Sequence, residues 1–381
     1  MKPIVIIGTG LAGYNLAKEL RRLNNEAPLR IVTADNGDSY SKPMLSNALT
    51  KGKTPEQLII APAEKMAAQL NATIETNTRV TKIDAAAKTI STDDHVIAYD
   101  KLVLATGASQ ITLPIAGTGA DEVFSVNDLQ EYAQFRDALD NANTVAIIGP
   151  GLIGCEFAND MLGVGKNVTV IGPGETPLDR LVPPEAGQLL REVLEEHGVG
   201  WRLGVTAVSI NRQHTGYNLV LSDGSELQAD VVLSAIGLRP NIELAQIAGA
   251  DTNQGIVVDR YLQSSLPDIY ALGDCAEVAG QVRPYVLPLV NGARALAKTL
   301  SGTSTTIRYP AMPVVIKTPA HPIVISPPSS GAQGTWQVDA EGSGVRAHFR
   351  NADSRLLGFA LTGDKVPEKQ ALTKELPAVL V

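Results

Sequence analysis

Residues 4–13 read Ile-Val-Ile-Ile-Gly-Thr-Gly-Leu-Ala-Gly, and residues 145–154 read Val-Ala-Ile-Ile-Gly-Pro-Gly-Leu-Ile-Gly. Each stretch is an apolar run that leads into the pattern Gly-x-Gly-x-x-Gly. Helix-compatible residues follow in both places, at 14–23 and 155–163, and a further β-rich run comes after each of them. The sequence therefore predicts two β-α-β units, each with a glycine fingerprint at the turn from strand to helix.

The spacing of the glycines has a physical reason. The first permits a sharp turn, the second lets the backbone approach a pyrophosphate, and the third lets the helix pack on the strand. One such pattern in a glycine-rich chain is also explained by an ordinary tight turn, but two copies between strand and helix favour two dinucleotide sites. The contacts predicted for these sites are Gly8, Thr9, Gly10, Leu11, Ala12 and Gly13 in the first copy, and Gly149, Gly151, Leu152, Ile153 and Gly154 in the second.

Composition excludes several classes of protein. The 381 residues are 44% hydrophobic and 19% charged, which is a globular balance. The net charge of −8 and the lack of a Lys/Arg run argue against nucleic acid as a partner. After Met1-Lys2-Pro3 only four apolar residues come before Gly8, and no run approaches about 18 apolar residues, so we expect no membrane insertion and a cytoplasmic location.

The cysteine and histidine residues are too few, and too far apart in the sequence, to indicate a metal site or a catalytic nucleophile. The two cysteines, Cys155 and Cys275, form neither a Cys-x-x-Cys pair nor a zinc framework. The five histidines have no metal-ligand spacing, and there is no Gly-x-Ser-x-Gly elbow. We therefore expect no metal site and no catalytic side-chain nucleophile, and we interpret both cysteines as small buried packing residues.

Two glycine-bearing strand ends, 102–107 and 231–237, bracket the second unit, which indicates a domain inserted into another. The predicted fold is α/β, with two Rossmann-like dinucleotide-binding domains, one inserted in the other, and a small α+β C-terminal domain. That last domain is indicated by a proline-studded tail of short strands that ends in a predicted helix at 368–380. The predicted boundaries are 1–108 and 235–310 for the interrupted domain, 109–234 for the inserted one and 311–381 for the C-terminal one.

The order of motifs resembles the pyridine nucleotide–disulfide oxidoreductase superfamily. Besides the two fingerprints, it comprises 105–107 (Ala-Thr-Gly), 235–241 (Ala-x-Gly-x-x-Pro-Asn) and 269–274 (Ile-Tyr-Ala-Leu-Gly-Asp). The segment 39–46, Ser-Tyr-Ser-Lys-Pro-Met-Leu-Ser, looks like the Tyr-x-(Lys/Arg)-Pro-x-Leu-Ser motif of the ferredoxin-reductase-like branch. With the stretches 154–160, 273–277 and 315–319, the chain is similar to the bacterial rubredoxin–NAD reductases within that branch.

This resemblance implies FAD in the interrupted domain, NADH in the inserted one and a C-terminal domain beside the flavin. Disulfide reductases carry a redox cysteine near the flavin, where this chain has Lys42. The implied activity is therefore electron transfer from NADH through FAD to rubredoxin, a small iron–sulfur protein, which would supply an alkane hydroxylase. The alternatives are an NADH–ferredoxin reductase, an NADH oxidase, and a flavin-bound redox sensor that turns over slowly.

Two carboxylates are candidates for FAD. Asp35 follows the second strand of the first unit, where a ribose-binding carboxylate is expected, although a solvated turn residue is the alternative. Asp274 ends a strand and fits the ribityl chain, with a helix cap as its alternative. The backbone of Leu287 opens a helix whose amides would face the flavin. The resemblance adds the FAD contacts Ala34, Val80, Ala105, Thr106 and Gly107.

Three charged residues are candidates for the flavin itself. Lys42 and Lys317 are ordinary surface lysines on the simplest interpretation, but Lys317 interrupts an apolar strand, and a fixed cation would stabilise reduced flavin. Glu156 either complements the dipole of its helix or, by resemblance, reaches the place where nicotinamide and flavin meet. We also expect the segment 42–45 to form part of the docking patch for rubredoxin.

The nicotinamide site lacks one usual feature. The position after the second strand where an acidic residue is expected is Gly172, so we assign the ribose to Glu175 in the following loop and add Gly237 to the site. No arginine occupies 172–174 to receive a 2′-phosphate, which favours NADH over NADPH.

Overall fold

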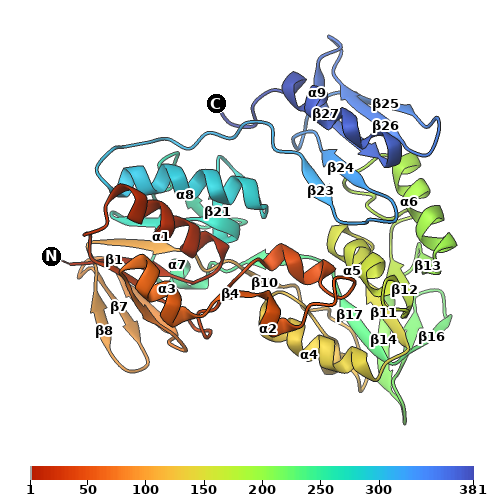
Figure 1. The fold of residues 1–381 in the computed structure, drawn as a ribbon, viewed down its shortest axis with the longest axis horizontal. Helices are drawn as coiled ribbons and strands as arrows, with labels where there is room; N and C mark the ends of the chain where they lie inside the picture. Colours follow the sequence, from red (N-terminus) through yellow and green to blue (C-terminus); the bar gives the residue numbers. More distant parts are fainter. Residues whose placement is uncertain (1) are drawn as a thin grey trace.

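The computed structural model describes residues 2–381 and contains three layered units (Figure 1). The first unit is built on a parallel five-stranded sheet of order β20-β9-β1-β2-β5. Its strands are β1 (Ile4–Ile7), β2 (Leu29–Val32), β5 (Thr73–Glu75), β9 (Lys101–Leu104) and β20 (Ile269–Ala271). Because β9 and β20 pair directly although the second unit lies between them in sequence, the sheet is assembled from both sides of an insertion.

Helices α1 (Leu11–Leu23) and α8 (Val286–Leu300) pack against each other over this sheet. The strand β1 is fully apolar and buried, and α1 turns Leu16 and Ala17 into the same core. The smaller elements around it are β3 (Ser39–Tyr40), η1 (Lys42–Asn47), α2 (Pro55–Leu58), β4 (Ile59–Ala61), α3 (Ala63–Leu70), β6 (Val80–Asp84), β7 (Thr89–Thr92), β8 (Val96–Ala98), α7 (Glu243–Ile247), β19 (Ile256–Val258), η3 (Gly273–Cys275), β21 (Ala276–Val278) and β22 (Gln281–Val282).

The second unit repeats the pattern with a parallel sheet of order β13-β12-β11-β17 and an antiparallel sheet β14-β15-β16. A pair of antiparallel strands, β10 and β18, connects it to the first unit. Strands β15 and β16 form an antiparallel hairpin across residues 222–225. The elements are β10 (Ala108–Gln110), η2 (Ala120–Glu122), α4 (Leu129–Asp140), β11 (Thr144–Ile148), α5 (Leu152–Leu162), β12 (Asn167–Gly172), α6 (Pro184–Glu196), β13 (Gly200–Leu203), β14 (Ala207–Arg212), β15 (Tyr217–Leu221), β16 (Glu226–Ala229), β17 (Val231–Ser234) and β18 (Leu238–Pro240).

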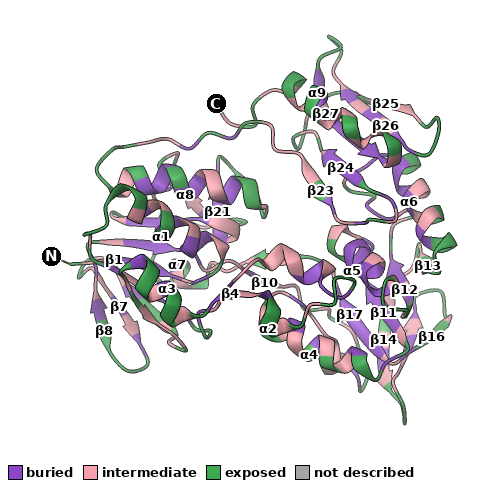
Figure 2. Cartoon of the chain, in the orientation of Figure 1, coloured by how far each residue is buried: buried purple, intermediate pink, exposed green. Residues whose placement is uncertain are grey.

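The third unit is an antiparallel sheet of order β23-β24-β27-β26-β25 with one short helix. Buried residues lie mainly on the strands and on the helix faces toward them (Figure 2). Ile316 and Ile323 of this unit share one apolar core with Phe157 of α5, so the third unit packs on the second. The elements are β23 (Val314–Ile316), β24 (Ile323–Ser326), β25 (Thr335–Asp339), β26 (Arg346–Arg350), β27 (Leu356–Thr362), η4 (Gly363–Glu368) and α9 (Lys369–Glu375).

The prediction of a helix to residue 380 was wrong. Helix α9 ends at Glu375, because Pro377 disfavours the helical conformation of Leu376, whose ψ of 142° is extended. The chain then pairs with the linker before the third unit, where the amide of Leu380 donates to the carbonyl of Tyr309 at 3.0 Å. No helix within residues 2–381 is long and apolar enough to cross a bilayer.

Candidate functional site

The first glycine fingerprint has the geometry of a phosphate-binding turn. Gly8 has a φ of +110°, and a Cβ there would lie 2.4 Å from the carbonyl oxygen of Ala105; a Cβ on Gly13 would lie 2.0 Å from the Gly8 oxygen. Around Gly10, by contrast, a Cβ would meet nothing within 4 Å. The outer glycines are therefore required by backbone packing, while Gly10 leaves open space at the N-terminus of α1, which fits a pyrophosphate.

The second fingerprint repeats this geometry. Gly149 has a φ of +115°, and its Cβ would lie 2.6 Å from the Ala235 oxygen; that of Gly154 would lie 1.9 Å from the Gly149 oxygen. Gly151 again faces open space, at the start of α5. The residues of both turns thus fit one dinucleotide each.

Asp35 is held next to the first fingerprint. Its Oδ1 accepts hydrogen bonds from the hydroxyls of Thr9 (3.0 Å) and Thr33 (2.7 Å) and from the amide of Gly37 (2.9 Å). Three donors on one oxygen fix the carboxylate and leave Oδ2 without a hydrogen bond among the described residues. Asp35 thus stabilises its own turn through Oδ1 and keeps Oδ2 as a hydrogen-bond acceptor beside the fingerprint. The contact of Asp35 and Ala34 with a ribose stays a prediction.

Asp274 and Lys42 are close enough for the charge of each to act on the pKa of the other. Burial raises the pKa of the Asp274 carboxyl, and the Lys42 charge opposes that rise. Burial also lowers the pKa of the Lys42 ammonium, against the charges of Asp274, Asp128 and Glu131. The Lys42 Nζ donates to Oδ1 of Asn127 at 2.5 Å. Lys42 is therefore a partly buried cation near a carboxylate, not a solvated surface lysine.

Glu156 and Lys317 form an ion pair, which the sequence did not indicate because the two were assigned to the flavin separately. The Glu156 side chain is 1% exposed and pairs with the Lys317 ammonium, while the backbone amide of Lys317 donates to Glu156 Oε1 at 2.9 Å. The hydroxyl of Ser46 donates to Glu156 Oε2 at 2.5 Å and accepts from Lys317 Nζ at 2.9 Å. Sequence reasoning missed Ser46, although it lies within the quoted motif at 39–46.

The segment 42–45 does not form an exposed patch. Leu45 is 3% exposed and belongs to the core beneath α5, and the residues before it are half-buried. The expectation that this segment forms part of the docking patch for rubredoxin is therefore wrong for Leu45, which packs against the inserted unit, and it stays a prediction for residues 42–44.

Glu175 lines an open pocket of about 360 Å³ at the carboxyl ends of β12 and β13. The carboxyl ends of parallel strands meet at one edge of a sheet, which is where α/β folds bind ligands. Sequence reasoning missed every other lining residue, because these residues come from α6, from β13 and the loop after it, and from the turn between β15 and β16. These are Arg191, Trp201, Arg202, Leu203, Gly204, Val205 and Asp223.

The remaining predicted residues lie at strand ends and first helical turns. Thr106 and Gly107 follow β9, and the Thr106 hydroxyl donates to the carbonyl of Asn241 at 3.0 Å. Leu287 and Ile153 lie in the first turns of α8 and α5 and are 50% and 43% exposed. The other members are Leu11 and Ala12 in the first turn of α1, Val80 at the start of β6, Leu152 at the start of α5, and Gly237 before β18 with a φ of +117°.

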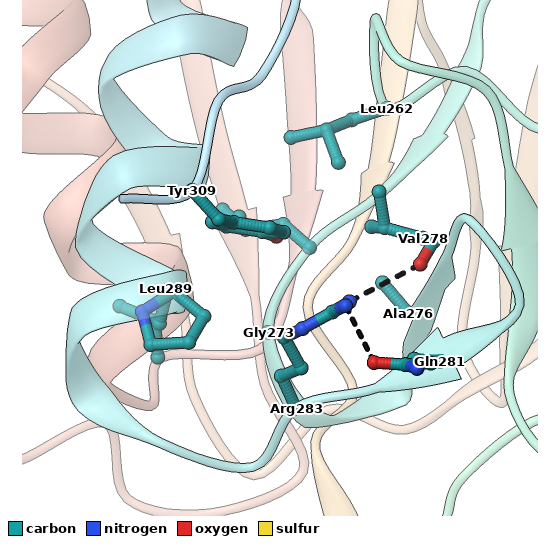
Figure 3. A pocket seen from close by; sticks show the side chains of 10 residues that line it. Leu262, Gly273, Ala276, Val278, Gln281, Arg283, Leu289 and Tyr309 are labelled. Carbon is teal, nitrogen blue, oxygen red and sulfur yellow. Dashed lines mark hydrogen bonds between the residues drawn. The ribbon is translucent and has the colours of Figure 1, made fainter. Parts of the chain in front are cut away.

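A second cavity lies behind Gly273 but is too small for a cofactor (Figure 3). Its volume of about 10 Å³ has room for about one water molecule. Arg283 stacks over the ring of Tyr309 at 5.1 Å and donates to Gln281 Oε1 at 2.6 Å.

The cysteines are buried, as expected. Cys155 and Cys275 are both 0% exposed, and burial raises the pKa of each thiol. Within residues 2–381 no three His, Cys, Asp or Glu side chains are placed to hold a metal ion.

Comparison with known proteins agrees with this geometry. Residues 2–296 match the family described as pyridine nucleotide-disulphide oxidoreductase. The chain belongs to that family. Within this oxidoreductase family, residues 306–376 of the chain match a further domain, described as a rubredoxin binding C-terminal domain.

Individual relatives cover the whole chain. It is 51% identical to the rubredoxin-NAD(+) reductase of Alcanivorax borkumensis, over 100% of both chains. It is 43% identical to that of Acinetobacter baylyi, over 100% of this chain and 99% of the relative. Among solved structures, the ferredoxin reductase of Rhodopseudomonas palustris has a TM-score of 0.89 at 26% identity, covering 99% of this chain and 96% of that one. The expected oxidoreductase fold is confirmed.

Proposed function

We propose that this chain transfers electrons from NADH, through bound FAD, to rubredoxin. The observation that carries the proposal is the combination of two fingerprint turns, each with an open central glycine, and a C-terminal unit that matches a rubredoxin-binding domain. Full-length relatives at 51% and 43% identity are named for that reaction. When bound, FAD accepts a hydride from the nicotinamide and releases electrons singly.

We assign FAD to the interrupted domain, 1–108 and 235–310, and NADH to the inserted domain, 109–234. The first fingerprint, Asp35 and Asp274 lie in the interrupted domain, and the second fingerprint and Glu175 lie in the inserted one. The two open glycines would admit the pyrophosphates to the helix N-termini. In this assignment the third unit, 311–381, contributes Lys317 to the flavin and the docking surface to rubredoxin.

In this proposal the side chains of the protein bind and orient the cofactors and take no part in bond making or breaking. Lys317 and Lys42 supply positive charge where reduction would place negative charge, and the amides at the start of α8, Leu287 included, act in the same direction. The thiols of Cys155 and Cys275 are buried and protonated, so no thiol relay is available.

The decisive experiment is anaerobic reduction of the purified protein. We expect a yellow protein with one FAD per chain that bleaches on addition of NADH and then reduces rubredoxin with saturation. Equal, non-saturating rates with rubredoxin and with a generic dye would contradict a dedicated partner. A colourless protein that does not take up FAD would contradict the flavin assignment itself.

A second candidate is an NADH–ferredoxin reductase, which the fold of the Rhodopseudomonas palustris enzyme favours. The same experiment separates it, because ferredoxin would then saturate at lower concentration than rubredoxin. Rapid consumption of NADH by oxygen alone would indicate an NADH oxidase. Reduction without turnover on any carrier would indicate a redox sensor.

We also propose a cytoplasmic location, since the donor NADH is held in that compartment and both cysteines are unpaired, as is usual there. Supply of an alkane hydroxylase by the reduced rubredoxin stays a prediction.

A further inference from the structure

Ser46 lies where the three units meet. It comes from η1 in the first unit, and its hydroxyl contacts Glu156 from α5 of the second unit and Lys317 from the strand end after β23 of the third. In sequence these partners are 110 and 271 residues away. No other side chain of the described chain bridges the two charges of this ion pair.

The hydroxyl is suited to this place because it is both donor and acceptor. It donates to Glu156 Oε2 at 2.5 Å and accepts from Lys317 Nζ at 2.9 Å. It therefore provides one hydrogen bond to the carboxylate and one to the ammonium. Because the Glu156 carboxylate is 1% exposed, hydrogen-bond donors of the protein must replace the water that would otherwise solvate it. A methyl group in place of the hydroxyl would leave the Lys317 ammonium with a single anchor on a long, flexible stem.

The two side chains of the ion pair differ in their exposure to solvent. The Glu156 side chain is 1% exposed, whereas that of Lys317 is 25% exposed. Glu156 follows Gly154 of the second fingerprint by two residues, and Ser46 follows Lys42 by four. The pair therefore joins the helix that begins at the second fingerprint to the segment that carries Lys42, and its more exposed member is the Lys317 cation.

We propose that Ser46 is a positioning residue that holds the Lys317 ammonium toward the flavin and thereby sets how readily the bound flavin is reduced. This inference rests on the proposed function, since it requires FAD beside Lys317. Ser46 itself takes no part in bond making or breaking; it acts through Lys317 and Glu156.

The test compares Ser46→Ala with Ser46→Thr, which keeps the hydroxyl, and with Ser41→Ala in the same segment, whose hydroxyl makes no hydrogen bond within residues 2–381. The FAD content, the thermal midpoint and the midpoint potential of the bound flavin are measured for each FAD-loaded protein. We expect Ser46→Ala to lower the equilibrium constant for flavin reduction roughly tenfold, which is ~30 mV for a two-electron couple. Ser46→Thr and Ser41→Ala should keep the wild-type potential.

A double-mutant cycle with Lys317→Met tests whether Ser46 acts on the flavin potential through Lys317. If Ser46 acts through Lys317, then Ser46→Ala has no further effect on the potential in the Lys317→Met protein. A fully FAD-loaded Ser46→Ala protein with the wild-type potential overturns the proposal, and so do additive effects in the cycle.

If Ser46→Ala does not retain FAD, the same measurements are made on Ser46→Cys, which keeps the size but is a weak donor and acceptor. An unchanged potential in that variant overturns the proposal, and a lowered one supports it. Failure of the wild-type protein to reduce rubredoxin would contradict the proposed acceptor without affecting these potentials, so the two failures are distinguishable.

Discussion

Thr50 donates two hydrogen bonds to Asp160, which lies 110 residues away in the sequence. The amide of Thr50 donates to Asp160 Oδ1 at 2.9 Å, and its hydroxyl donates to the carbonyl of Asp160 at 2.9 Å. The amide of Leu49 donates to the other carboxylate oxygen, also at 2.9 Å. This contact fixes the segment that carries Lys42 and Ser46 against α5, the helix that begins at the second fingerprint.

Replacement of Asp160 should therefore destabilise the protein. In Asp160→Ala the amide of Leu49 loses its partner in a buried place, and we expect the free energy of unfolding to fall by about 2 to 4 kcal/mol. Urea unfolding of the FAD-loaded protein measures this. Asp137→Ala, at an exposed position of α4, is the control and should change the stability by less than about 0.5 kcal/mol. Equal stabilities of the two variants would contradict a role for this contact.

The central glycines of the two fingerprints should separate the two sites. A Cβ at Gly10 or Gly151 meets no protein atom within 4 Å, so both alanine variants should fold. We expect Gly10→Ala to weaken FAD binding at least about tenfold, and Gly151→Ala to keep FAD while the KM for NADH rises about tenfold. FAD titration and steady-state kinetics measure the two effects. Loss of flavin from Gly151→Ala would mean that the assignment is reversed.

The cysteines should be dispensable for electron transfer. Because both thiols are fully buried with raised pKa values, the native protein should not react with a disulfide reagent until it is unfolded. Cys155→Ser and Cys275→Ser should reduce rubredoxin within about twofold of the wild-type rate. Stopped-flow kinetics and thiol titration test this, and a loss of more than tenfold in a correctly FAD-loaded variant would restore the case for a thiol relay.

Asp268 should contribute to the loss of stability in acid. Hydrogen bonds from Lys101 and Lys88 hold the pKa of its carboxyl below the usual 3.8. A depressed folded pKa adds stability that is present above the unfolded pKa and is lost as the pH falls through the folded one. Asp268→Asn should lower the free energy of unfolding by about 1 kcal/mol near neutral pH and by less below pH ~4.

Thermal midpoints from pH 3 to 7 measure this difference. The exposed Asp93→Asn variant is the control and should follow the wild-type curve throughout. A constant offset between Asp268→Asn and the wild type at every pH would show that the effect is not electrostatic.

Local features of the sequence were sufficient for the secondary structure around both fingerprints. Steric requirements at Gly8, Gly13, Gly149 and Gly154 are set by neighbouring backbone atoms, so the glycine spacing reports them directly. The end of α9 was also encoded locally, since Pro377 is a helix-ending signal that the predicted range of 368–380 ran past.

The candidate site could be predicted from the sequence only in part. The sequence identified Lys42, Glu156, Lys317 and Asp274 one by one, through motifs that resemble a known family. It did not indicate that Glu156 pairs with Lys317, nor that Leu45 is buried. Those facts depend on which surfaces the units press together.

The sequence by itself thus determined two dinucleotide turns and the absence of a thiol pair near the first turn, because each depends on residues close together in the chain. It also indicated the insertion, because the order of the glycine-bearing strand ends along the chain brackets the second unit. Only the tertiary structure decided that Ser46, Glu156 and Lys317 form one hydrogen-bonded cluster and that Glu175 shares a pocket with Arg202. The reason is that these contacts join residues from separate elements or separate units. Their geometry follows from helix and sheet packing, which no local spacing encodes.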